Sequence, residues 1–549
     1  MIEVPVLIVG GGPVGLTASI LLSQHGIRSL LAERHPGTAV HPKARGINAR
    51  TMEMYHQIGV APAIRAAGLP PDRARFIVWS KTLAGEEIER RVPGRSRAEN
   101  QSVSPVRNCL CAQDYLEPVL RTHAERETLG ELRFNTDVAA FEQDAGGVTV
   151  TLTDRAAAGS RTETRVRAQY VIAADGAQSR IRRTLGVRMI GKEDAYESVN
   201  VLINADLRPW TEHRPSALYF IEHPEIKATF LTIDGIDRWG FLVNSLADYG
   251  LTPADFTPDR TIELVRLAAG VPELAVKVLG VAPWTASAHV AEHYGHGRIF
   301  LTGDAAHEMP PTGGFGLNTG VQDVQNLAWK LAGVLHGWAA PSLLDTYDAE
   351  RRPVGRAITE QSLVNSISMG RLGKTPGLAR PEYLNEQGLI FGASYHSAAV
   401  IPDGTPPPAV ENPVTDYVPS ARPGGRAPHV WLERGGQRVS TIDLVGRRFV
   451  LFASGPAWRD AAPRMTSRVP LDVLTIGAGG DLADPEGQWL ATYGVAEGGA
   501  ALVRPDGYVA WRCRAPVADP AGVLHTALAS MLGMSGMDLG PIGGSREVA

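Results

Sequence analysis

The stretch GDAAHEMPPTGGFGLNTGVQD, residues 303–323, combines an acid, a histidine, two adjacent prolines and five glycines directly before a helical pattern. Residues 298–302 before it are typical of a buried strand, and apolar residues recur at helical spacing from Val321 to Leu335. Gly303 lets the backbone approach a ligand, because glycine carries no side chain, and Asp304 would project from the strand end. The stretch therefore predicts a strand, a ligand-contacting loop and a helix.

A second glycine-rich turn occurs at the N-terminus, in VPVLIVGGGPVGLTASILLSQHGIRSLLAERH, residues 4–35. The pattern predicts a strand over 4–9, a helix over 16–25 and a strand over 29–32 that ends at Glu33. The G-x-G-x-x-G motif between strand and helix is typical of dinucleotide binding, with the pyrophosphate at the helix N-terminus and the acid on a ribose. A purely structural turn is the alternative, and the motif does not separate NAD from FAD. The residues of this turn are Gly10, Gly12, Pro13, Val14 and Gly15.

A third motif follows another buried strand in QYVIAADGAQSRIRR, residues 169–183. Asp175 and Gly176 come directly after the strand, and Ser179 precedes a basic helix start. Taken alone, Asp175 could equally be the N-cap of that helix.

The three motifs together resemble the fingerprints of the class A flavin-dependent aromatic hydroxylases, which share the para-hydroxybenzoate hydroxylase fold. GGGPVG, DGAQSRIR and GDAAHEMPPTGGFGLN stand in the family's order. HPKARGINARTMEMYHQIGV (41–60) and CAQDYLEPVL (111–120) are similar to its FAD-contacting segments. Chain length and the C-terminal third resemble hydroxylases of aromatic polyketides, such as the anthracycline 11-hydroxylases.

The resemblance implies an α/β fold in three parts. A discontinuous, Rossmann-like (GR2) FAD-binding domain would comprise residues 1–185 and 285–400. A mixed or antiparallel substrate-binding sheet would be inserted at 186–284, with parts of 70–110. After a Pro- and Gly-rich linker at 402–428, a thioredoxin-like domain would span 429–535 without a C-x-x-C pair.

The resemblance also implies how FAD is held. Arg34 would flank the adenosine, Val138 would offer its backbone to adenine, and Arg45 and Gln113 would contact phosphate or ribityl groups. Asp304 would bind near the ribityl chain, and the loop at 310–318 would run along the flavin ring. The expected cofactor residues are Gly10, Gly12, Pro13, Val14, Gly15, Glu33, Arg34, Arg45, Gln113, Val138, Asp175, Gly303, Asp304, Pro311, Gly314, Gly316, Leu317 and Asn318.

The family scheme implies a transient NADPH or NADH donor, O₂, and a flavin C4a-hydroperoxide that hydroxylates a phenolic, polyketide-type ring. The region around Asp175 and Arg182 would matter for the donor. His307 is expected to be structural, and His396 is the candidate for a catalytic phenol contact. The expected substrate pocket consists of Tyr219, Phe241, Pro310, Thr312 and Gly313.

Composition limits the other function classes. The net charge of −4 and the lack of a basic run argue against nucleic-acid binding. Three cysteines give no metal cluster or C-x-x-C, and no uninterrupted apolar run reaches the roughly 20 residues of a membrane span. We expect a cytoplasmic monomer or homodimer without a metal. A Baeyer–Villiger monooxygenase, an oxidase and a non-catalytic binding protein on the same fold remain alternatives.

Overall fold

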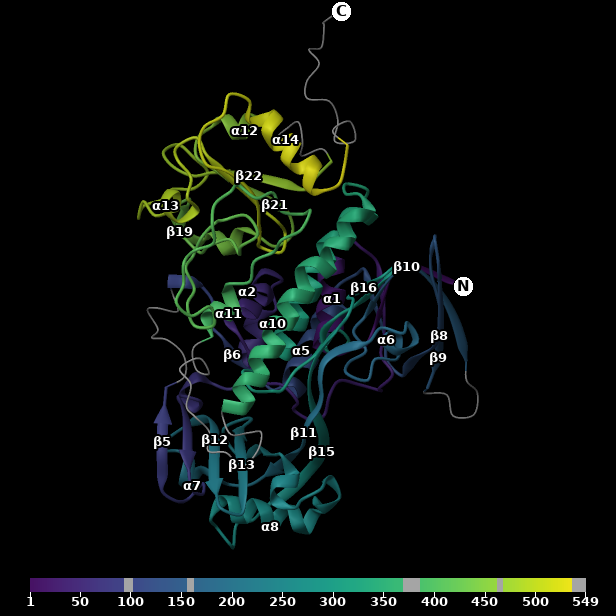
Figure 1. Ribbon diagram of the computed structural model, residues 1–549, viewed down its shortest axis with the longest axis vertical. Coiled ribbons are helices and arrows are strands. Elements are labelled where there is room, and N and C mark those ends of the chain that lie inside the picture. The colour runs from purple at the N-terminus through teal and green to yellow at the C-terminus, as the bar shows by residue number, and fades with distance from the viewer. Residues whose placement is uncertain (93–101, 156–161, 369–385, 462–467, 536–549) are drawn as a thin grey trace, which may run out of the picture.

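The structure, a computed structural model, describes residues 1–92, 102–155, 162–368, 386–461 and 468–535. The predicted domain ranges therefore include four internal segments outside the described residues, at 93–101, 156–161, 369–385 and 462–467. The chain is arranged in three parts along its long axis. The N-terminal sheet lies in the middle, a second sheet lies below it, and the C-terminal unit lies above it (Figure 1).

The first sheet contains eight strands: β1 (Ile2–Val9), β2 (Ser29–Ala32), β7 (Gly130–Arg133), β8 (Thr136–Asp144), β9 (Gly147–Asp154), β10 (Glu163–Ala173), β16 (Gly295–His296) and β17 (Ile299–Leu301). Their order is β16-β17-β10-β1-β2-β7, and β9 and β8 extend from β10 as an antiparallel ribbon. β17, β10, β1, β2 and β7 are parallel. Parallel strands end at the same edge, so the turns after β1, β10 and β17 are brought together there.

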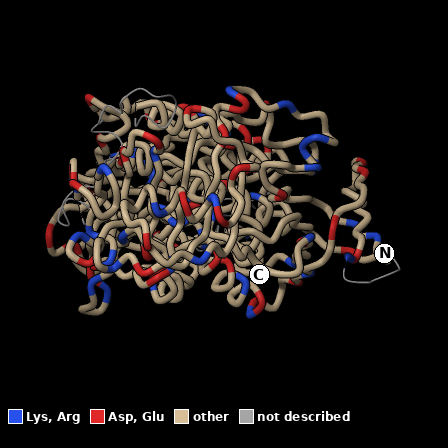
Figure 2. The backbone as a smooth tube through the Cα atoms, turned by 90° about the horizontal axis from the view of Figure 1, so that it is seen from below, with Lys and Arg blue, Asp and Glu red and all other residues tan. Residues whose placement is uncertain are grey.

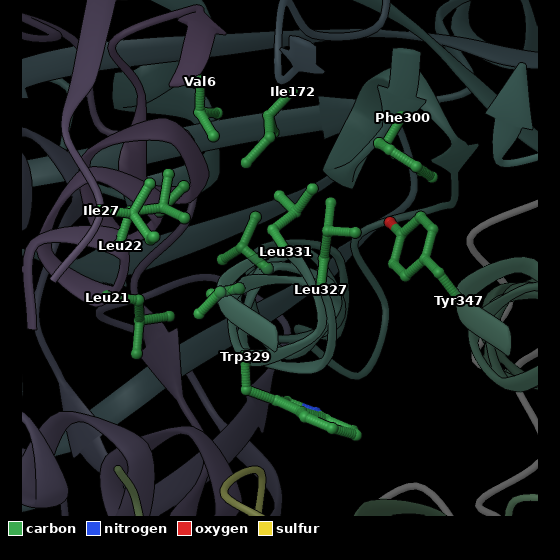
Figure 3. Packing of buried hydrophobic residues seen from close by; sticks show 14 of the residues in the cluster. Val6, Leu21, Leu22, Ile27, Ile172, Phe300, Leu327, Trp329, Leu331 and Tyr347 are labelled. Atoms are coloured by element: carbon green, nitrogen blue, oxygen red, sulfur yellow. The ribbon is translucent and has the colours of Figure 1, made fainter. Parts of the chain in front are cut away.

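Helices surround this sheet: α1 (Pro13–Gln24), α2 (Ala49–Gln57), α3 (Ala61–Ala67), α5 (Gln113–Arg126), α6 (Arg180–Thr184), α9 (Gly316–Leu335), α10 (Thr346–Ser368) and α11 (Gln387–Phe391). A two-stranded ladder joins β3 (Gly46–Ile47) to β6 (Cys109–Leu110). Leu327 and Leu331 of α9 pack beneath Val6, Ile172 and Phe300 of the sheet, as Figure 3 shows. This apolar layer fixes the direction in which α1 and α9 leave their strands.

The second sheet contains β4 (Phe76–Ser80), β5 (Glu87–Arg91), β11 (Met189–Asn204), β12 (Ser216–His223), β13 (Ile226–Thr232), β14 (Arg238–Asn244), β15 (Lys277–Ala291) and β18 (His307–Glu308). Their order is β18-β15-β11-β14-β13-β12-β4-β5. The long strands β11 and β15 connect this sheet to the first one (Figure 1). The short helix α7 (Arg208–Thr211) and helix α8 (Pro258–Ala269) also belong to this part, and α8 packs on one face of the sheet.

The C-terminal unit contains the hairpin β19 (Trp431–Arg434) and β20 (Gln437–Ser440), then β21 (Phe449–Ala453), α12 (Ala457–Ala461), β22 (Leu471–Thr475), α13 (Trp489–Tyr493), β23 (Ala500–Val503), β24 (Val509–Cys513) and α14 (Pro520–Met531). Its four-stranded sheet has the order β22-β21-β23-β24. β21 and β22 are parallel, whereas β23 and β24 form an antiparallel hairpin.

Helix α9 is buried between the first sheet and the C-terminal unit. Trp329 lies on its far side and packs edge-on against Phe449 of β21, with ring centroids 5.5 Å apart. Charged groups are buried at this interface. Glu350 of α10 accepts hydrogen bonds from Arg504 at 2.6 and 2.8 Å and from Lys330 of α9 at 2.8 Å, and all three side chains are fully buried. The C-terminal unit therefore docks through paired charges as well as apolar contacts.

Lys and Arg are interspersed with Asp and Glu over the backbone trace seen in Figure 2. Within the described ranges, no helix combines the length and the apolar character needed to cross a bilayer.

We predict that Glu350→Gln destabilises the protein by about 3–5 kcal/mol, because it leaves the buried Lys330 charge without its counter-ion and leaves Arg504 with Asp506 alone. The positive neighbours hold the pKa of Glu350 below its usual value although burial opposes this, so the lost group is the carboxylate. The measurement is urea unfolding. Glu360→Gln, on an exposed face of the same helix, should unfold like the wild type. Equal stability of both variants would contradict the prediction.

Candidate active site

A single cavity of about 2440 Å³ opens at the edge where β1, β10 and β17 end and extends to the second sheet. Ligand pockets are ordinarily about 300–1,000 Å³, so this cavity has room for a large cofactor together with a second molecule. Its wall contains every predicted cofactor residue except Gly15 and Gly303. The cavity is thus the place at which the three sequence motifs meet.

The first helix N-terminus on the cavity belongs to α1. Gly12 is the N-cap and no side chain caps the helix, so its first N–H groups face the cavity. Gly10 adopts φ +108°, and a Cβ there would lie 2.2 Å from the Ala174 carbonyl oxygen. A Cβ on Gly15 would lie 1.9 Å from the Gly10 carbonyl oxygen. Gly15 therefore lets the helix pack against the turn, which explains why it lies behind the cavity wall.

Glu33 lies at the end of β2, as the sequence predicts, and is 9% exposed. One carboxylate oxygen accepts a hydrogen bond from the Gly11 N–H, and the other accepts from the His35 N–H at 2.8 Å. The acid is therefore fixed beside the glycine-rich turn. Arg34 next to it is exposed and lines the cavity, as does Val138 in β8.

The second helix N-terminus belongs to α9, whose N-cap Phe315 provides no side-chain hydrogen bond. Gly303 adopts φ +58° and packs against α1. A Cβ on Gly303 would lie 3.1 Å from the Val14 side chain. Asn318 ties the loop to the chain before α2: it accepts from the Asn48 N–H at 2.9 Å and donates to the Gly46 carbonyl at 2.9 Å. Pro311, Gly314, Gly316 and Leu317 also line the cavity. Two uncapped helix N-termini therefore face one space.

Two acids of the predicted motifs line the cavity between these helices. Asp304 is exposed toward the cavity and enclosed elsewhere, and this burial raises its pKa although His307 opposes the shift. Burial also raises the pKa of Asp175, which accepts from the Ile181 N–H at 3.2 Å. Arg182 joins the two motifs, because it donates to the carbonyl oxygens of Ala305 and Ala177 at 3.2 and 2.9 Å.

Arg45 and Gln113 both line the cavity and also hold protein together. Arg45 donates to the carbonyl oxygens of Ala217 and Thr232, each at 2.6 Å, and so links the first part of the chain to the second sheet. Gln113 donates to Glu117 at 2.6 Å. Their FAD contacts stay predictions that follow from the resemblance.

The predicted pocket residues Tyr219 and Phe241 lie on the wrong face of the second sheet. Phe230 pairs with both of them, and the three rings are buried in the cluster that α8 covers. The Tyr219 hydroxyl donates to the Arg214 carbonyl at 2.9 Å. Side chains alternate between the two faces of a sheet, but this alternation does not reveal which face α8 covers. The other face presents Leu218, Leu231 and Leu242 to the cavity.

Pro310 and Gly313 line the cavity as predicted, whereas Thr312 points away and its hydroxyl lies 2.7 Å from that of Ser366. The catalytic prediction for His396 is wrong in its placement. His396 is exposed and does not belong to the cavity wall, while its neighbour Tyr395 is buried against Tyr508. The same segment contributes Phe391 to the wall instead, because α11 turns that residue inward.

His307 lies in the core, as expected for a structural residue. It is fully buried, and its Nε2 is 2.7 Å from an oxygen of Asp323. Sequence reasoning missed Lys43 and Glu386 of the cavity wall. Lys43 stands in a segment that the resemblance had marked, but Glu386 follows no motif and becomes visible only when α10 and α11 are placed.

The cavity fits FAD by its donor set. Two helix N-termini offer N–H groups, the bare backbone at Gly12 and Gly314 leaves room for close approach, and Glu33 lies where a ribose would be held. At Gly314 an added Cβ would meet nothing within 4 Å, so the space beside the loop is open.

Comparison with known proteins agrees with this geometry. Residues 3–362 match the family described as FAD binding domain, and residues 420–535 match the aromatic-ring hydroxylase C-terminal family. A putative polyketide hydroxylase of Streptomyces halstedii is 41% identical, with 94% of each chain covered. The flavin-dependent monooxygenase PieE, solved with FAD and substrate, has a TM-score of 0.90 at 36% identity and covers 97% of this chain and 100% of its own.

Aklavinone-11 hydroxylase, solved as a ternary complex with FAD and aklavinone, has a TM-score of 0.85 at 36% identity, with 97% of this chain and 99% of that chain covered. The protein belongs to the FAD-binding aromatic-ring hydroxylase family. It is an FAD-dependent aromatic hydroxylase, a monooxygenase, as the three motifs had indicated.

We predict that Gly15→Ala abolishes detectable FAD retention, because the added methyl group would displace the Gly10 backbone. The measurement is the ratio of flavin to protein absorbance after purification. Gly295→Ala is the control, since its Cβ would meet only Phe300 at an ordinary 3.5 Å. Full FAD content in Gly15→Ala would contradict the prediction.

Proposed function

We propose that the protein hydroxylates a polycyclic phenol of the polyketide type, with NADPH or NADH as a transient electron donor. One observation carries the proposal: the cavity runs without interruption from the two uncapped helix N-termini to the apolar residues Leu218, Leu231 and Leu242 of the second sheet. A flat aromatic molecule fits between such a sheet face and a cofactor ring. Aklavinone, the molecule bound in one solved relative, supports this class.

Different residues of the cavity wall would have different roles in the reaction. Bound FAD supplies the oxygen chemistry, and the chain supplies orientation and electrostatics. The α1 N-terminus would hold the pyrophosphate, and the α9 N-terminus would stabilise negative charge at the ring. Leu218, Leu231 and Leu242 would exclude water from the reacting ring, which limits loss of oxygen as peroxide. Asp304 and Asn318 would position the groups between these ends.

Glu386 is our candidate for the substrate contact in place of His396. It stands at the start of α11 in the cavity wall, and one carboxyl oxygen accepts from Asn365 Nδ2 at 2.9 Å. Gln361 donates to the Asn365 oxygen at 2.8 Å, which fixes the orientation of that amide. Burial raises the pKa of Glu386 well above its usual range. In its neutral form the carboxyl would donate a hydrogen bond to a substrate oxygen.

The domain organisation and the state of the protein in solution are proposals as well. The order β22-β21-β23-β24, with one parallel pair and one hairpin, supports a thioredoxin-like C-terminal domain, whose role would be structural because its sequence has no C-x-x-C. The domain ranges 1–185 with 285–400, 186–284, 402–428 and 429–535 stand as proposed. A monomer or homodimer in the cytoplasm is the working state.

The test is the visible spectrum of the purified protein, then anaerobic reduction by NADPH with and without a polycyclic phenol. We expect a yellow protein whose flavin is reduced at least about tenfold faster with the phenol. Equal rates without phenol would favour an oxidase or another substrate class. A colourless protein that takes up no added FAD would overturn the proposal.

We predict that Glu386→Ala raises the substrate KM by about tenfold, as expected for loss of one hydrogen bond to a buried polar group, with a smaller change in kcat. Glu386→Gln should keep most of the affinity, because its amide can still accept from Asn365 and donate to the substrate. Steady-state NADPH oxidation coupled to product formation measures both constants. Glu360→Gln is the matched control on exposed surface. An unchanged KM in Glu386→Ala would remove Glu386 from the site.

A further inference from the structure

The turn that carries Asp304 into the cavity is fixed from behind by Asp323 of α9. One Asp323 oxygen accepts from the Gly303 N–H at 3.1 Å and lies 2.7 Å from His307 Nε2. Asp323 and His307 are both fully buried, and neither lines the cavity. The left-handed backbone at Gly303 is thus set by a carboxylate that the cofactor cannot touch.

Asp323 is in turn fixed by Arg351 of α10. The guanidinium Nε donates to the second Asp323 oxygen at 2.8 Å, and Nη2 donates to the Thr319 carbonyl in the first turns of α9 at 3.2 Å. Burial would raise the pKa of Asp323, but His307 and Arg351 outweigh it and hold the pKa below its usual value. The turn is therefore held by a charged group, and its geometry depends on where Arg351 lies.

The third nitrogen of Arg351 reaches Tyr395, which leads to the C-terminal unit. Arg351 Nη1 donates to the Tyr395 hydroxyl at 3.0 Å. The Tyr395 ring stacks on Tyr508, with centroids 4.0 Å apart and an interplanar angle of 25°. Arg504 lies 5.3 Å from the Tyr395 ring centre and is itself paired with Glu350. Contacts therefore run without a gap from the C-terminal unit to the cavity turn.

We propose that Arg351 and Tyr395 are positioning residues through which the C-terminal unit sets the Gly303–Asp304 turn, and hence the affinity for FAD. The proposal rests on FAD binding in this cavity and on no particular substrate. According to this proposal the C-terminal unit affects FAD binding, although Tyr508 does not line the cavity. Without the Tyr395 hydroxyl, Arg351 loses one of its three partners, and the anion that holds Gly303 is less firmly placed.

The experiment compares two buried tyrosines that each lose only a hydroxyl. Tyr395→Phe removes the group that Arg351 contacts, whereas Tyr493→Phe removes a hydroxyl of the C-terminal unit that donates to the Pro428 carbonyl at the end of the linker, at 3.1 Å. Full-length apoprotein of each variant is titrated with FAD, followed by flavin fluorescence and by the visible spectrum. Urea unfolding of the same samples measures the loss of stability.

We expect similar losses of stability in the two variants, but a rise of the FAD dissociation constant of about three- to tenfold only in Tyr395→Phe. Tyr508→Leu, which removes the stacked ring and leaves the Tyr395 hydroxyl, should weaken FAD in the same direction. Tyr508→Phe keeps the ring and should bind like the wild type. If Tyr395→Phe does not fold, the comparison of Tyr508→Leu with Tyr508→Phe still tests whether the C-terminal unit affects FAD affinity.

Wild-type FAD affinity and an unshifted spectrum in both Tyr395→Phe and Tyr508→Leu would overturn the proposal and leave these residues with a structural role. An equal loss of affinity in Tyr493→Phe would overturn it too, since general destabilisation would then explain the effect. Failure of the wild-type chain to bind FAD would also overturn the function proposed above, and that outcome is distinct from the other two.

Discussion

Helix α9 must present an uncapped N-terminus to the cavity while nearly all of its length is buried. An exposed N-terminus is what gives the helix its partial positive charge toward the cavity. A helix buried on both sides cannot leave charged side chains unpaired, because an unpaired buried charge is strongly destabilising. Asp323 and Lys330 therefore need partners from elsewhere, and the arrangement of α10 and the C-terminal unit follows from this need.

The partners of Asp323 and Lys330 are two adjacent residues of α10. Arg351 compensates Asp323, and Glu350, one residue earlier on α10, compensates Lys330 and Arg504. Two successive side chains of one helix thus serve the cofactor turn and the C-terminal interface. A mutation at the interface is expected to reach the cofactor site through these charges, although no atom of the C-terminal sheet lies in the cavity wall.

The second sheet packs into the core with one face and lines the cavity with the other. One face carries the aromatic row Tyr219, Phe230 and Phe241 into the core under α8, and the other turns aliphatic side chains to the cavity. Large rings stabilise the sheet where they are fully buried. Smaller leucines stand on the face that lines the cavity. Arg45 holds this sheet against the cofactor domain through two backbone carbonyls.

The sequence by itself predicted the strand-end side of the cavity: the glycines of both turns, Glu33 and Asp304 are local signals, because glycine-rich turns and helix starts are encoded in short motifs. The strand before Gly303, β17, joins the sheet of the N-terminal strand β1 through β10. Only the tertiary structure decided the substrate end. Whether Tyr219 or Leu218 faces the cavity depends on where α8 packs, and whether His396 or Glu386 reaches it depends on how α10 and α11 meet, since no local pattern specifies contacts between distant segments.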